Sequence, residues 1–487
     1  MFRNGKIGAL VVFLVLILGT SLAMAQNTGT VVPLNSDREL FVDRYVIDHL
    51  TGTQLVLHHP HDEGAVLKFD RPWEGAFCGY VTVIKDGHLF RLYYRGLPDA
   101  KHEVGKGVVT CYAESRDGIH WRKPNLKLFK IMGTWENNVI LAGNTTAAHN
   151  FSPFLDTRPG VNPNQRYKAL GGLKESGLLA FASPDGIHWK PVQKAPVLTK
   201  GAFDSQNVAF WSQKEHKYVC YFRTWHKIGK KGYRTVSRST STDFLHWSDP
   251  VEMTFGNTPP ENLYTNQTHP YFRAPQIYIS VAARFMPKRQ VLTAAQAKAL
   301  GVNPDYFKDC SDAVFMSSRG GNVYQRTFME GFIRPGIGLQ NWVSRTNYPA
   351  LHVVQTGANE MSIYVNQNYA QPTANLHRYS LRLDGFVSVQ APYTGGEMLT
   401  KPLTFRGKHL YLNFSTSAAG EIRVEIQNAK GQPIPGFSLQ DAEPIIGNEI
   451  ERAVSWKNGS DVSRLAGKVV RLRFVMKDAD LYAIQFK

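Results

Sequence analysis

The sequence lacks the signatures that mark several common classes of enzyme. Its 487 residues contain no GxSxG nucleophile elbow, no HExxH zinc motif, no Walker phosphate loop and no dinucleotide-binding glycine pattern. The enzymes that depend on those motifs are therefore excluded. The four cysteines are far apart, form no CxxC pair and lie mainly in apolar strand-like runs. We therefore predict buried thiols, with neither a disulfide framework nor a metal site, at Cys78, Cys111, Cys220 and Cys310.

Long apolar stretches are also scarce. One occurs at the N-terminus, where Arg3 and Lys6 precede an apolar stretch over residues 7–22. This pattern, followed by small residues, predicts a secretory signal peptide over residues 1–25, with a retained membrane anchor as the alternative. No later stretch reaches the roughly 20 apolar residues that a membrane span needs. We therefore expect a secreted or periplasmic protein that has no integral membrane segment after signal removal.

A basic helix or a long run of Lys and Arg is absent as well, although the formal net charge is +17. The lysines and arginines are scattered singly through strands and loops, so nucleic-acid binding is not expected. A strongly basic secreted protein favours anionic partners such as a sulfated or uronic polysaccharide. A charge that serves only solubility is the alternative.

The sequence does contain a repeated phrase. It reads SRDGIHW at 115–121 and SPDGIHW at 183–189, and a degraded copy, STDFLHW, stands at 241–247. Short strand-like segments linked by turns precede each copy, as in the blades of a β-propeller. The Asp-Gly pair suits a tight turn with positive φ, and the Trp is expected to pack between neighbouring blades. We therefore interpret the phrase as structural, with ligand contact by His120 or His188 as the alternative.

The spacing of these units predicts five blades, with six as the alternative. In the fourth unit Gly320–Gly321 and Tyr324 take the places of Asp-Gly and Trp, and a short helix is expected around 293–300. The fifth unit lacks a fourth strand. The N-terminal segments 39–48 and 53–60 are the candidates to supply it and close the ring.

After Pro392 the pattern changes to strict alternation of apolar and polar residues, which is typical of half-buried antiparallel strands. A β-sandwich is the natural interpretation. The predicted fold is thus all-β, with a five-bladed β-propeller over residues 26–392 followed by a C-terminal β-sandwich over residues 393–487.

Acidic residues at the starts of inner propeller strands are the candidate catalytic groups. Inner strands begin near the central funnel, and glycoside hydrolysis needs two carboxyl groups beside the scissile bond. Asp204 stands directly before an apolar strand, Glu360 before another, and Glu74 follows a Trp in a turn. The structural alternatives are a turn cap, a solvated loop acid and a loop brace, respectively. Gln206 and Asn207 are candidate substrate-binding neighbours of Asp204.

The segment YTNQTHPYFRAP, residues 264–275, is the densest polar and aromatic stretch of the chain. Its tyrosines are candidates to stack on a sugar ring, and its polar side chains to bind hydroxyl or anionic groups. A strand entry held by two prolines is the alternative. Arg95, Arg273 and Arg334, the last in the loop between blades four and five, are expected to bind a carboxylate or sulfate together, with a structural salt bridge as the alternative for each. The substrate-binding residues predicted from these segments are Asn266, His269, Tyr271, Arg273, Arg334 and Arg95.

The phrases LFVDRYVID, YTNQTHPYFRAP, SRGGNVYQRTFMEGFIRPG and the SxDGxHW copies resemble secreted bacterial proteins described as glycoside hydrolase family 32-like. The resemblance covers nearly all of the mature chain, and it implies a five-bladed furanosidase-type propeller. The NDPNG, RDP and EC signatures of invertases and fructanases are missing, so it does not imply sucrose or fructan cleavage. The superfamily's first-blade Asp has two candidates, Asp43 and Asp70. Calcium enters only by analogy with this superfamily.

We therefore predict a secreted glycoside hydrolase, exo-acting on a poly- or oligosaccharide. A non-catalytic carbohydrate-binding propeller is the alternative. No cofactor is expected, and no metal site is predicted, because the histidine-rich segment 58–64 is broken by proline and lacks a helical ligand spacing.

Overall fold

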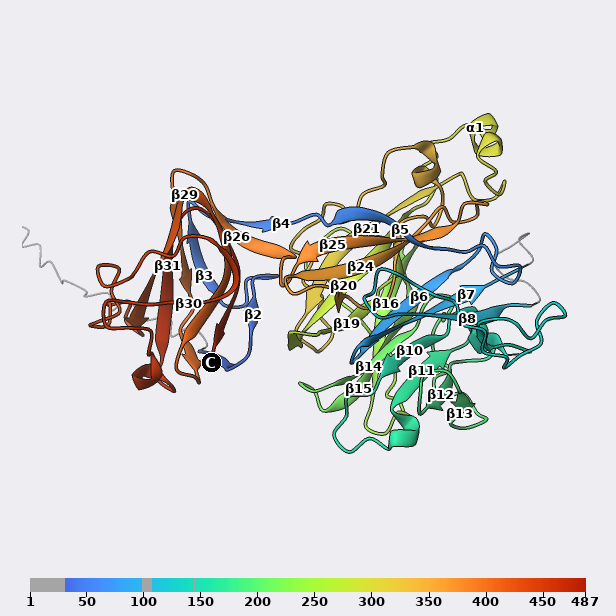
Figure 1. The fold of residues 1–487 in the computed structure, drawn as a ribbon, viewed down its shortest axis with the longest axis horizontal. Helices are drawn as coiled ribbons and strands as arrows, with labels where there is room; N and C mark the ends of the chain where they lie inside the picture. Colours follow the sequence, from blue (N-terminus) through green and yellow to red (C-terminus); the bar gives the residue numbers. More distant parts are fainter. Residues whose placement is uncertain (1–30, 99–106, 144) are drawn as a thin grey trace, which may run out of the picture.

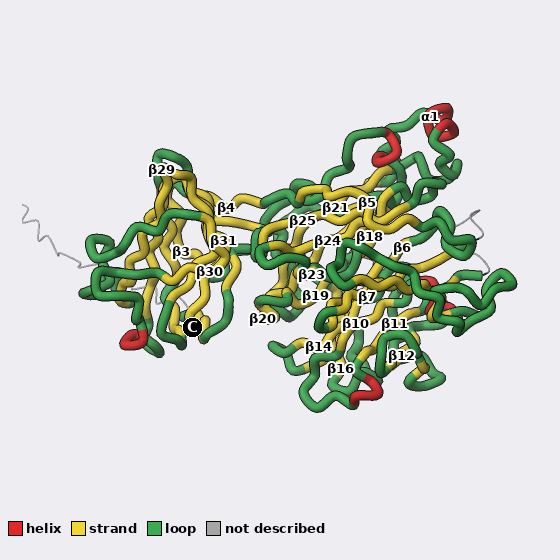
Figure 2. The backbone as a smooth tube through the Cα atoms, in the orientation of Figure 1, coloured by secondary structure: helices red, strands yellow, loops and turns green. Residues whose placement is uncertain are grey.

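A computed structural model describes residues 31–98, 107–143 and 145–487. The expected signal peptide, residues 1–25, lies outside the described residues. The described chain is almost entirely β (Figure 2), and α1 (Ala294–Ala299) is its one α-helix. This helix lies in the predicted insertion, and Thr293 and Gln296 form a capping box at its start.

Five antiparallel sheets form a β-propeller, which confirms the predicted count of five blades (Figure 1). The inner strands contact one another around a ring: β10 contacts β6 and β14, β14 contacts β19, β20 contacts β22, and β23 contacts β6. The strands are β6 (Gly79–Asp86), β7 (Leu89–Gly96), β8 (Val109–Ser115) and β9 (Val139–Leu141) in blade 1; β10 (Ser152–Leu155), β11 (Tyr167–Gly171), β12 (Leu179–Ser183) and β13 (Lys190–Pro191) in blade 2; β14 (Val208–Ser212), β15 (Lys217–Ile228), β16 (Lys231–Ser241) and β17 (Val251–Glu252) in blade 3; β18 (Leu263–Thr265), β19 (Thr268–Tyr271), β20 (Ala274–Met286) and β21 (Cys310–Ser318) in blade 4; and β22 (Tyr348–Pro349), β23 (Val354–Gln355), β24 (Glu360–Gln367), β25 (Asn375–Arg382) and β5 (His61–Lys68) in blade 5.

An N-terminal strand closes the ring, but neither predicted segment supplies it. β5 pairs antiparallel with β25 as the outer strand of blade 5. The expected segments 39–48 and 53–60 instead form β2 (Glu39–Leu40), β3 (Ile47–Thr51) and β4 (Gln54–Leu57), which join the other sheet. β5 is polar because it is an exposed outer strand, so its sequence gives little apolar signal.

The remaining strands form a β-sandwich, which is the second predicted unit (Figure 1). Its C-terminal strands are β26 (Val387–Ala391), β27 (Gly396–Thr400), β28 (Leu403–Phe405), β29 (Leu410–Asn428), β30 (Asn448–Ala453) and β31 (Val470–Phe486). β1 (Val32–Asn35) to β4 pair with these strands. The N-terminal strands β1 to β4 therefore belong to the sandwich, whereas the prediction placed them within the propeller, in the span 26–392.

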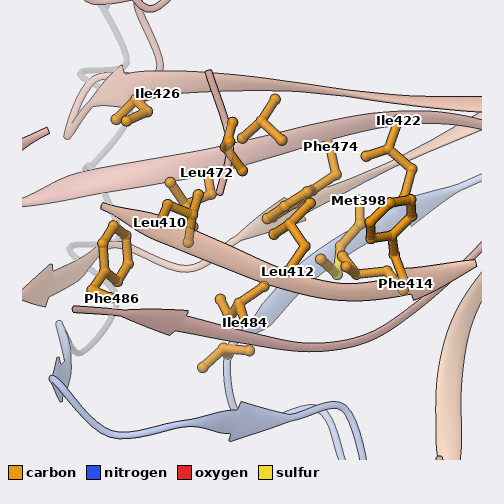
Figure 3. Packing of buried hydrophobic residues seen from close by; sticks show 14 of the residues in the cluster. Met398, Leu410, Leu412, Phe414, Ile422, Ile426, Leu472, Phe474, Ile484 and Phe486 are labelled. Atoms are coloured by element: carbon orange, nitrogen blue, oxygen red, sulfur yellow. The ribbon is translucent and has the colours of Figure 1, made fainter. Parts of the chain in front are cut away.

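The sandwich core follows the alternation seen in the sequence. Leu410, Leu412 and Phe414 of β29 point to the same side and are buried with Leu472 and Phe474 of β31 (Figure 3). Fully burying an aliphatic or aromatic side chain of this size stabilises a fold by about 1.5–3 kcal/mol. The long β29–β31 pairing thus gives the sandwich its own apolar core.

The repeated phrase is a structural turn, as predicted. In the first copy the backbone N–H groups of Asp117 and Gly118 donate to Ser115 Oγ, and His120 is fastened to the carboxylate of its own Asp117. Gly118 has φ 77°. Trp121 packs edge-on against Tyr364 of blade 5, with ring centroids 5.7 Å apart. The Trp therefore lies in the seam between blades 1 and 5.

The four cysteines are buried and free, as predicted. Burial raises the pKa of each thiol, and at Cys220 burial is the one cause of the shift. They therefore behave as small core residues.

Candidate functional site

A narrow polar funnel, with a cavity of about 20 Å³, opens at the end of the propeller where the inner strands of blades 1, 3 and 5 begin. Tyr80 stands at the start of β6, Gln206 before β14 and Tyr348 at the start of β22. The second strands of the blades add side chains from their ends, among them Arg95 of β7 and Asn366 of β24. We call this site the funnel. It is lined by Gly79, Tyr80, Val81, Arg95, Gln206, Tyr264, Thr265, Gln267, Arg345, Tyr348, Pro349, Asn366 and Tyr369.

Asp204 lies at the edge of the funnel, between two buried basic side chains. His149 Nε2 is 3.7 Å and Arg223 Nη1 is 3.5 Å from its carboxylate oxygens, while half of the Asp204 side chain (51%) is exposed. Burial raises the pKa of Asp204, but the hydrogen bond from His149 and the charges of Arg223 and Arg345 outweigh it. The net pKa lies below the ordinary value, so this carboxylate is ionised at neutral pH.

Two asparagine amides hold the turn that presents Asp204. Asn150 Nδ2 donates to the carbonyl oxygens of Phe203 and Ser205 at 2.7 and 2.8 Å, and Asn207 Nδ2 donates to the same two oxygens. Phe203 has φ 47°, which is strained for a residue other than glycine. Asn207 was predicted to bind substrate, and its position shows that it fixes the loop instead.

Three arginines gather around one tyrosine beside Asp204. The guanidinium carbons of Arg223, Arg345 and Arg234 lie 4.2, 5.1 and 5.5 Å from the centre of the Tyr264 ring. Burial lowers the pKa of Arg234, and the charge of Arg223 lowers it further. The Nε atoms of Arg223 and Arg234 are buried and have no hydrogen-bond partner among the described residues. Such a group of like charges attracts an anion.

A fourth arginine of the funnel also stacks on an aromatic ring. Arg95 stacks 4.8 Å above the Tyr80 ring, donates to Tyr369 Oη at 2.8 Å, and lies 3.2 Å from His149 Nε2. His149 therefore connects Arg95 to Asp204. The predicted residue Arg95 thus belongs to the funnel.

Several polar side-chain atoms that line the funnel have no hydrogen-bond partner among the described residues. Both side-chain polar atoms of Asn366, together with Gln267 Oε1 and Thr265 Oγ1, are buried and have no hydrogen-bond partner in the described part of the chain. Gln206 accepts a hydrogen bond from Gln267 at 2.7 Å and donates to Thr82 Oγ1. Buried polar groups are normally paired, so the unpaired ones indicate a site for a polar ligand.

Glu74 lies outside the funnel and has no exposed side-chain surface. Its carboxylate accepts hydrogen bonds from Tyr94 Oη at 2.5 Å, Lys123 Nζ at 2.7 Å and the backbone N–H of Arg71 at 2.8 Å. Every near neighbour is thus a fixed protein group. Glu74 braces blade 1 from within, which was the structural alternative for this residue.

Glu360 lies at the other end of the propeller. It begins β24, and the funnel residue Asn366 stands six positions later, about 20 Å along an extended strand. Its carboxylate pairs with Arg378 Nη1 at 2.7 Å and accepts from Thr356 Oγ1 at 2.8 Å. The structure therefore does not bring the three predicted acids together, because β24 is the second strand of its blade and not the innermost.

The segment 264–275 runs along the propeller axis and does not collect at one site. Tyr264 lies in the funnel, whereas His269 lines a cavity of about 440 Å³ at the opposite end. His269 Nε2 accepts from the backbone N–H of Val353, and burial lowers its pKa to about 4. Asn266 accepts from the N–H of Thr268. Both side chains therefore hold the inner strand in place.

Two further predicted residues join the propeller to the sandwich. Tyr271 Oη donates to Asp384 at 2.8 Å, and Arg273 Nη1 lies 3.2 Å from the same carboxylate. Arg38 of the sandwich forms the third contact, also at 3.2 Å. Arg334 is exposed in a loop after β21 and does not line the funnel. The predicted arginine triad is therefore not formed.

Sequence reasoning missed Tyr80, Arg223, Arg345, Asn366 and Tyr369. One signal was present, because Arg95 in YYRG and Arg223 in YFRTW each follow an aromatic pair on the second strand of their blade. Aligning the blades on these strands would have placed both arginines at the funnel. Arg345 stands in an irregular loop, which no repeat marks.

No group of three or more His, Cys, Asp or Glu side chains that could hold a metal occurs within residues 31–98, 107–143 and 145–487. Over the same residues, no helix is long and apolar enough to cross a membrane.

Five blades around a polar funnel, joined to a β-sandwich built from both ends of the chain, define the structural class. It is a five-bladed β-propeller protein with a β-sandwich, the fold that the sequence resemblance implied.

Comparison with known proteins gives matches by structure alone, because no protein-family model and no curated sequence matches the chain. A solved glycoside hydrolase is similar at 12% identity and a TM-score of 0.46, over 66% of this chain and 92% of that one. The GH32 β-fructofuranosidase of Bombyx mori is similar at 11% and 0.42, over 87% and 94%. The exo-inulinase of Aspergillus awamori is similar at 11% and 0.39, over 88% and 99%.

Proposed function

We propose that the protein acts on a poly- or oligosaccharide outside the cytoplasm, with an acidic sugar bound at the mouth of the funnel and its glycosidic bond hydrolysed beside Asp204. One observation carries the proposal: Arg223, Arg234 and Arg345 surround Tyr264 next to the half-exposed carboxylate of Asp204. Planar guanidinium groups suit the carboxylate of a uronic acid or a sulfate ester. The unpaired amide of Asn366 and the side chain of Gln267 would bind the sugar hydroxyl groups.

Asp204 has the properties of a nucleophile or a general base. Because its pKa lies below the ordinary value, it is not suited to protonate the leaving oxygen at neutral pH. It would therefore attack the anomeric carbon or activate a water. Glu74 and Glu360 do not supply the second carboxyl group, since both are committed elsewhere in the fold.

The end of the propeller that holds Glu360 faces the sandwich, so the funnel opens away from it. Gln355, Ala358 and Asn359 share a cavity with residues 448–451 of β30. A sugar chain approaching the funnel therefore does not meet the sandwich. The action we propose is exo, with the end of a chain seated at the mouth of the funnel.

Product analysis tests this proposal. The protein would be incubated with uronate-containing, sulfated and neutral oligosaccharides, and released sugars would be measured by chromatography and mass spectrometry. We expect release from at least one acidic substrate and none from its neutral counterpart. Release from neutral substrates alone would contradict the assignment of the arginines.

A second candidate is a non-catalytic propeller that binds an acidic glycan. The observation that favours it is that, of the three predicted acids, Asp204 alone lies at the edge of the funnel, whereas hydrolysis normally uses two carboxyl groups. This candidate predicts binding of acidic glycans without any product. It also predicts that Asp204→Asn changes only the affinity for the glycan, because this protein has no hydrolytic activity to lose.

A further inference from the structure

We propose that the hairpin of β15 and β16 forms a second sugar-binding subsite, in which Trp225 stacks on the acidic sugar next to the one in the funnel. The inference rests on the proposed function. It names a residue that makes the protein bind an oligosaccharide more tightly than a single sugar.

The hairpin extends past the inner strand at the funnel end of blade 3. β14 pairs with β15 only from Ser212–Lys217 to Val208–Tyr221, so the seven residues from Phe222 onward continue beyond the start of the inner strand. β16 pairs with them as far as Ile228–Lys231. The hairpin therefore stands at the rim of the funnel.

Strand alternation places the tip of the hairpin on the funnel side. Side chains two residues apart point to the same face of a strand. Arg223 reaches Asp204 and the carbonyl oxygen of Tyr264 in the funnel. Trp225 and Lys227 follow on the same face, and Arg234 stands directly opposite Trp225 on β16.

Arg234 connects Trp225 to the funnel. Its guanidinium carbon lies 4.8 Å from the Trp225 ring and 5.5 Å from the Tyr264 ring. Tyr264 lines the funnel. A sugar on Trp225 and a sugar on the arginine group at Tyr264 would therefore be neighbours, separated by one guanidinium.

Trp225 packs against two neighbours and remains half exposed. A Cβ at Gly232 would lie 3.5 Å from the indole ring, and the guanidinium of Arg234 lies over the ring. Nearly half of the side chain (48%) is nevertheless exposed. The other side of the hairpin is fastened by His226, whose Nδ1 lies 2.8 Å from Glu252 of β17. A rigid, half-open aromatic ring suits stacking on a flat ligand at little entropic cost.

The charge of the hairpin sets the class of its ligand. Residues 222–241 include no Asp or Glu, but they contain Arg223, Lys227, Lys230, Lys231, Arg234 and Arg238. The positive electrostatic potential of these residues attracts a carboxylate or sulfate group but not a neutral sugar. The occupant we infer is thus an acidic sugar unit of the same chain that enters the funnel.

Titration calorimetry with size-graded probes tests the inference. Glucuronic and galacturonic acid would be compared with oligogalacturonates and chondroitin sulfate oligosaccharides of two to six units. The proteins would be the wild type, Trp225→Ala and the control Trp135→Ala. Trp135 is an equally exposed tryptophan (51%) in the β8–β9 connection of blade 1. Thermal unfolding would verify that both variants fold.

We expect the wild type to bind an oligosaccharide about tenfold more tightly than its single sugar, or about 1.4 kcal/mol. Trp225→Ala should lose that gain while keeping the affinity for the single sugar, and Trp135→Ala should keep both. Equal loss of affinity for both ligand sizes, or no loss in Trp225→Ala, would overturn the subsite. Failure of the wild type to bind any acidic probe would instead contradict the proposed function, and the subsite with it.

Discussion

Asp204→Asn separates binding from chemistry at the funnel. The substitution keeps the size of the side chain and removes its negative charge. In the proposed hydrolase the amide neither attacks the sugar nor activates a water, so turnover should fall by about a thousandfold or more. Binding of an acidic sugar should improve, since the ligand no longer faces a like charge.

The size of that improvement follows from the geometry. Asp204 is half exposed and shares Arg223 at 3.5 Å with the incoming anion. Two like charges about 6 Å apart in a partly solvated site, at an effective dielectric constant of about 40, repel by roughly 1.4 kcal/mol. Affinity for the acidic sugar should therefore rise by about tenfold, and added salt should reduce this gain.

Single-turnover hydrolysis and calorimetry on the same preparations measure the two effects. Asn207→Ala is not a suitable control, because that amide holds the Asp204 turn. Glu360→Gln is suitable, since Glu360 lies at the far end of β24. An Asp204→Asn protein that hydrolyses at the wild-type rate would refute the catalytic role. Weaker binding of the acidic sugar by this variant would refute the electrostatic reasoning.

Three further predictions concern the parts of the fold that hold the site. Glu74→Gln should lower the free energy of unfolding by about 2 kcal/mol, because Lys123 loses its buried counter-charge and keeps only the exposed Asp70, 3.1 Å away; urea unfolding measures this, and a loss below about 1 kcal/mol would contradict the bracing role. Gly118→Ala should cost at least about 2 kcal/mol, because φ is 77° and the added Cβ would come within 2.8 Å of Tyr364 Oη. Gly87→Ala, with φ 59° and nothing within 4 Å, should cost clearly less, and equal losses would argue against crowding at the blade seam. Burial raises the pKa of Asp185, but hydrogen bonds from His188 outweigh it and bring the pKa to about 2. The ionised Asp185 should therefore stabilise the fold above about pH 4, and this contribution should be lost as the pH falls toward 2. Acid unfolding measures the effect, which Asp185→Asn should abolish.

The blade architecture was predictable because the turns repeat. The Ser-x-Asp-Gly unit forms the same hydrogen bonds in each copy, and even Phe244, which replaces the glycine in the third copy, adopts φ 72°. β5 was not predictable, since an outer strand exposed to water has no apolar pattern.

The candidate site was predictable only where a residue directly precedes a regular inner strand. Asp204 satisfies this condition through β14. In blade 5 the innermost strand is broken by Pro349 and by His352, which has φ 77°. The regular β24 therefore resembled an inner strand, and Glu360 was placed at the wrong end of the propeller. Arg345 comes from a loop whose position depends on packing between blades, which sequence alone does not reveal.

The most direct test of the central claim compares one acidic sugar with its neutral form. The wild-type protein would be titrated with the tightest uronate ligand and with the methyl ester of the same ligand. Losing a charge-assisted contact to a buried arginine costs about 2–5 kcal/mol. We predict that the ester binds at least about thirtyfold more weakly. Equal affinity for the acid and its ester would contradict the claim that the arginines around Tyr264 recognise an anion.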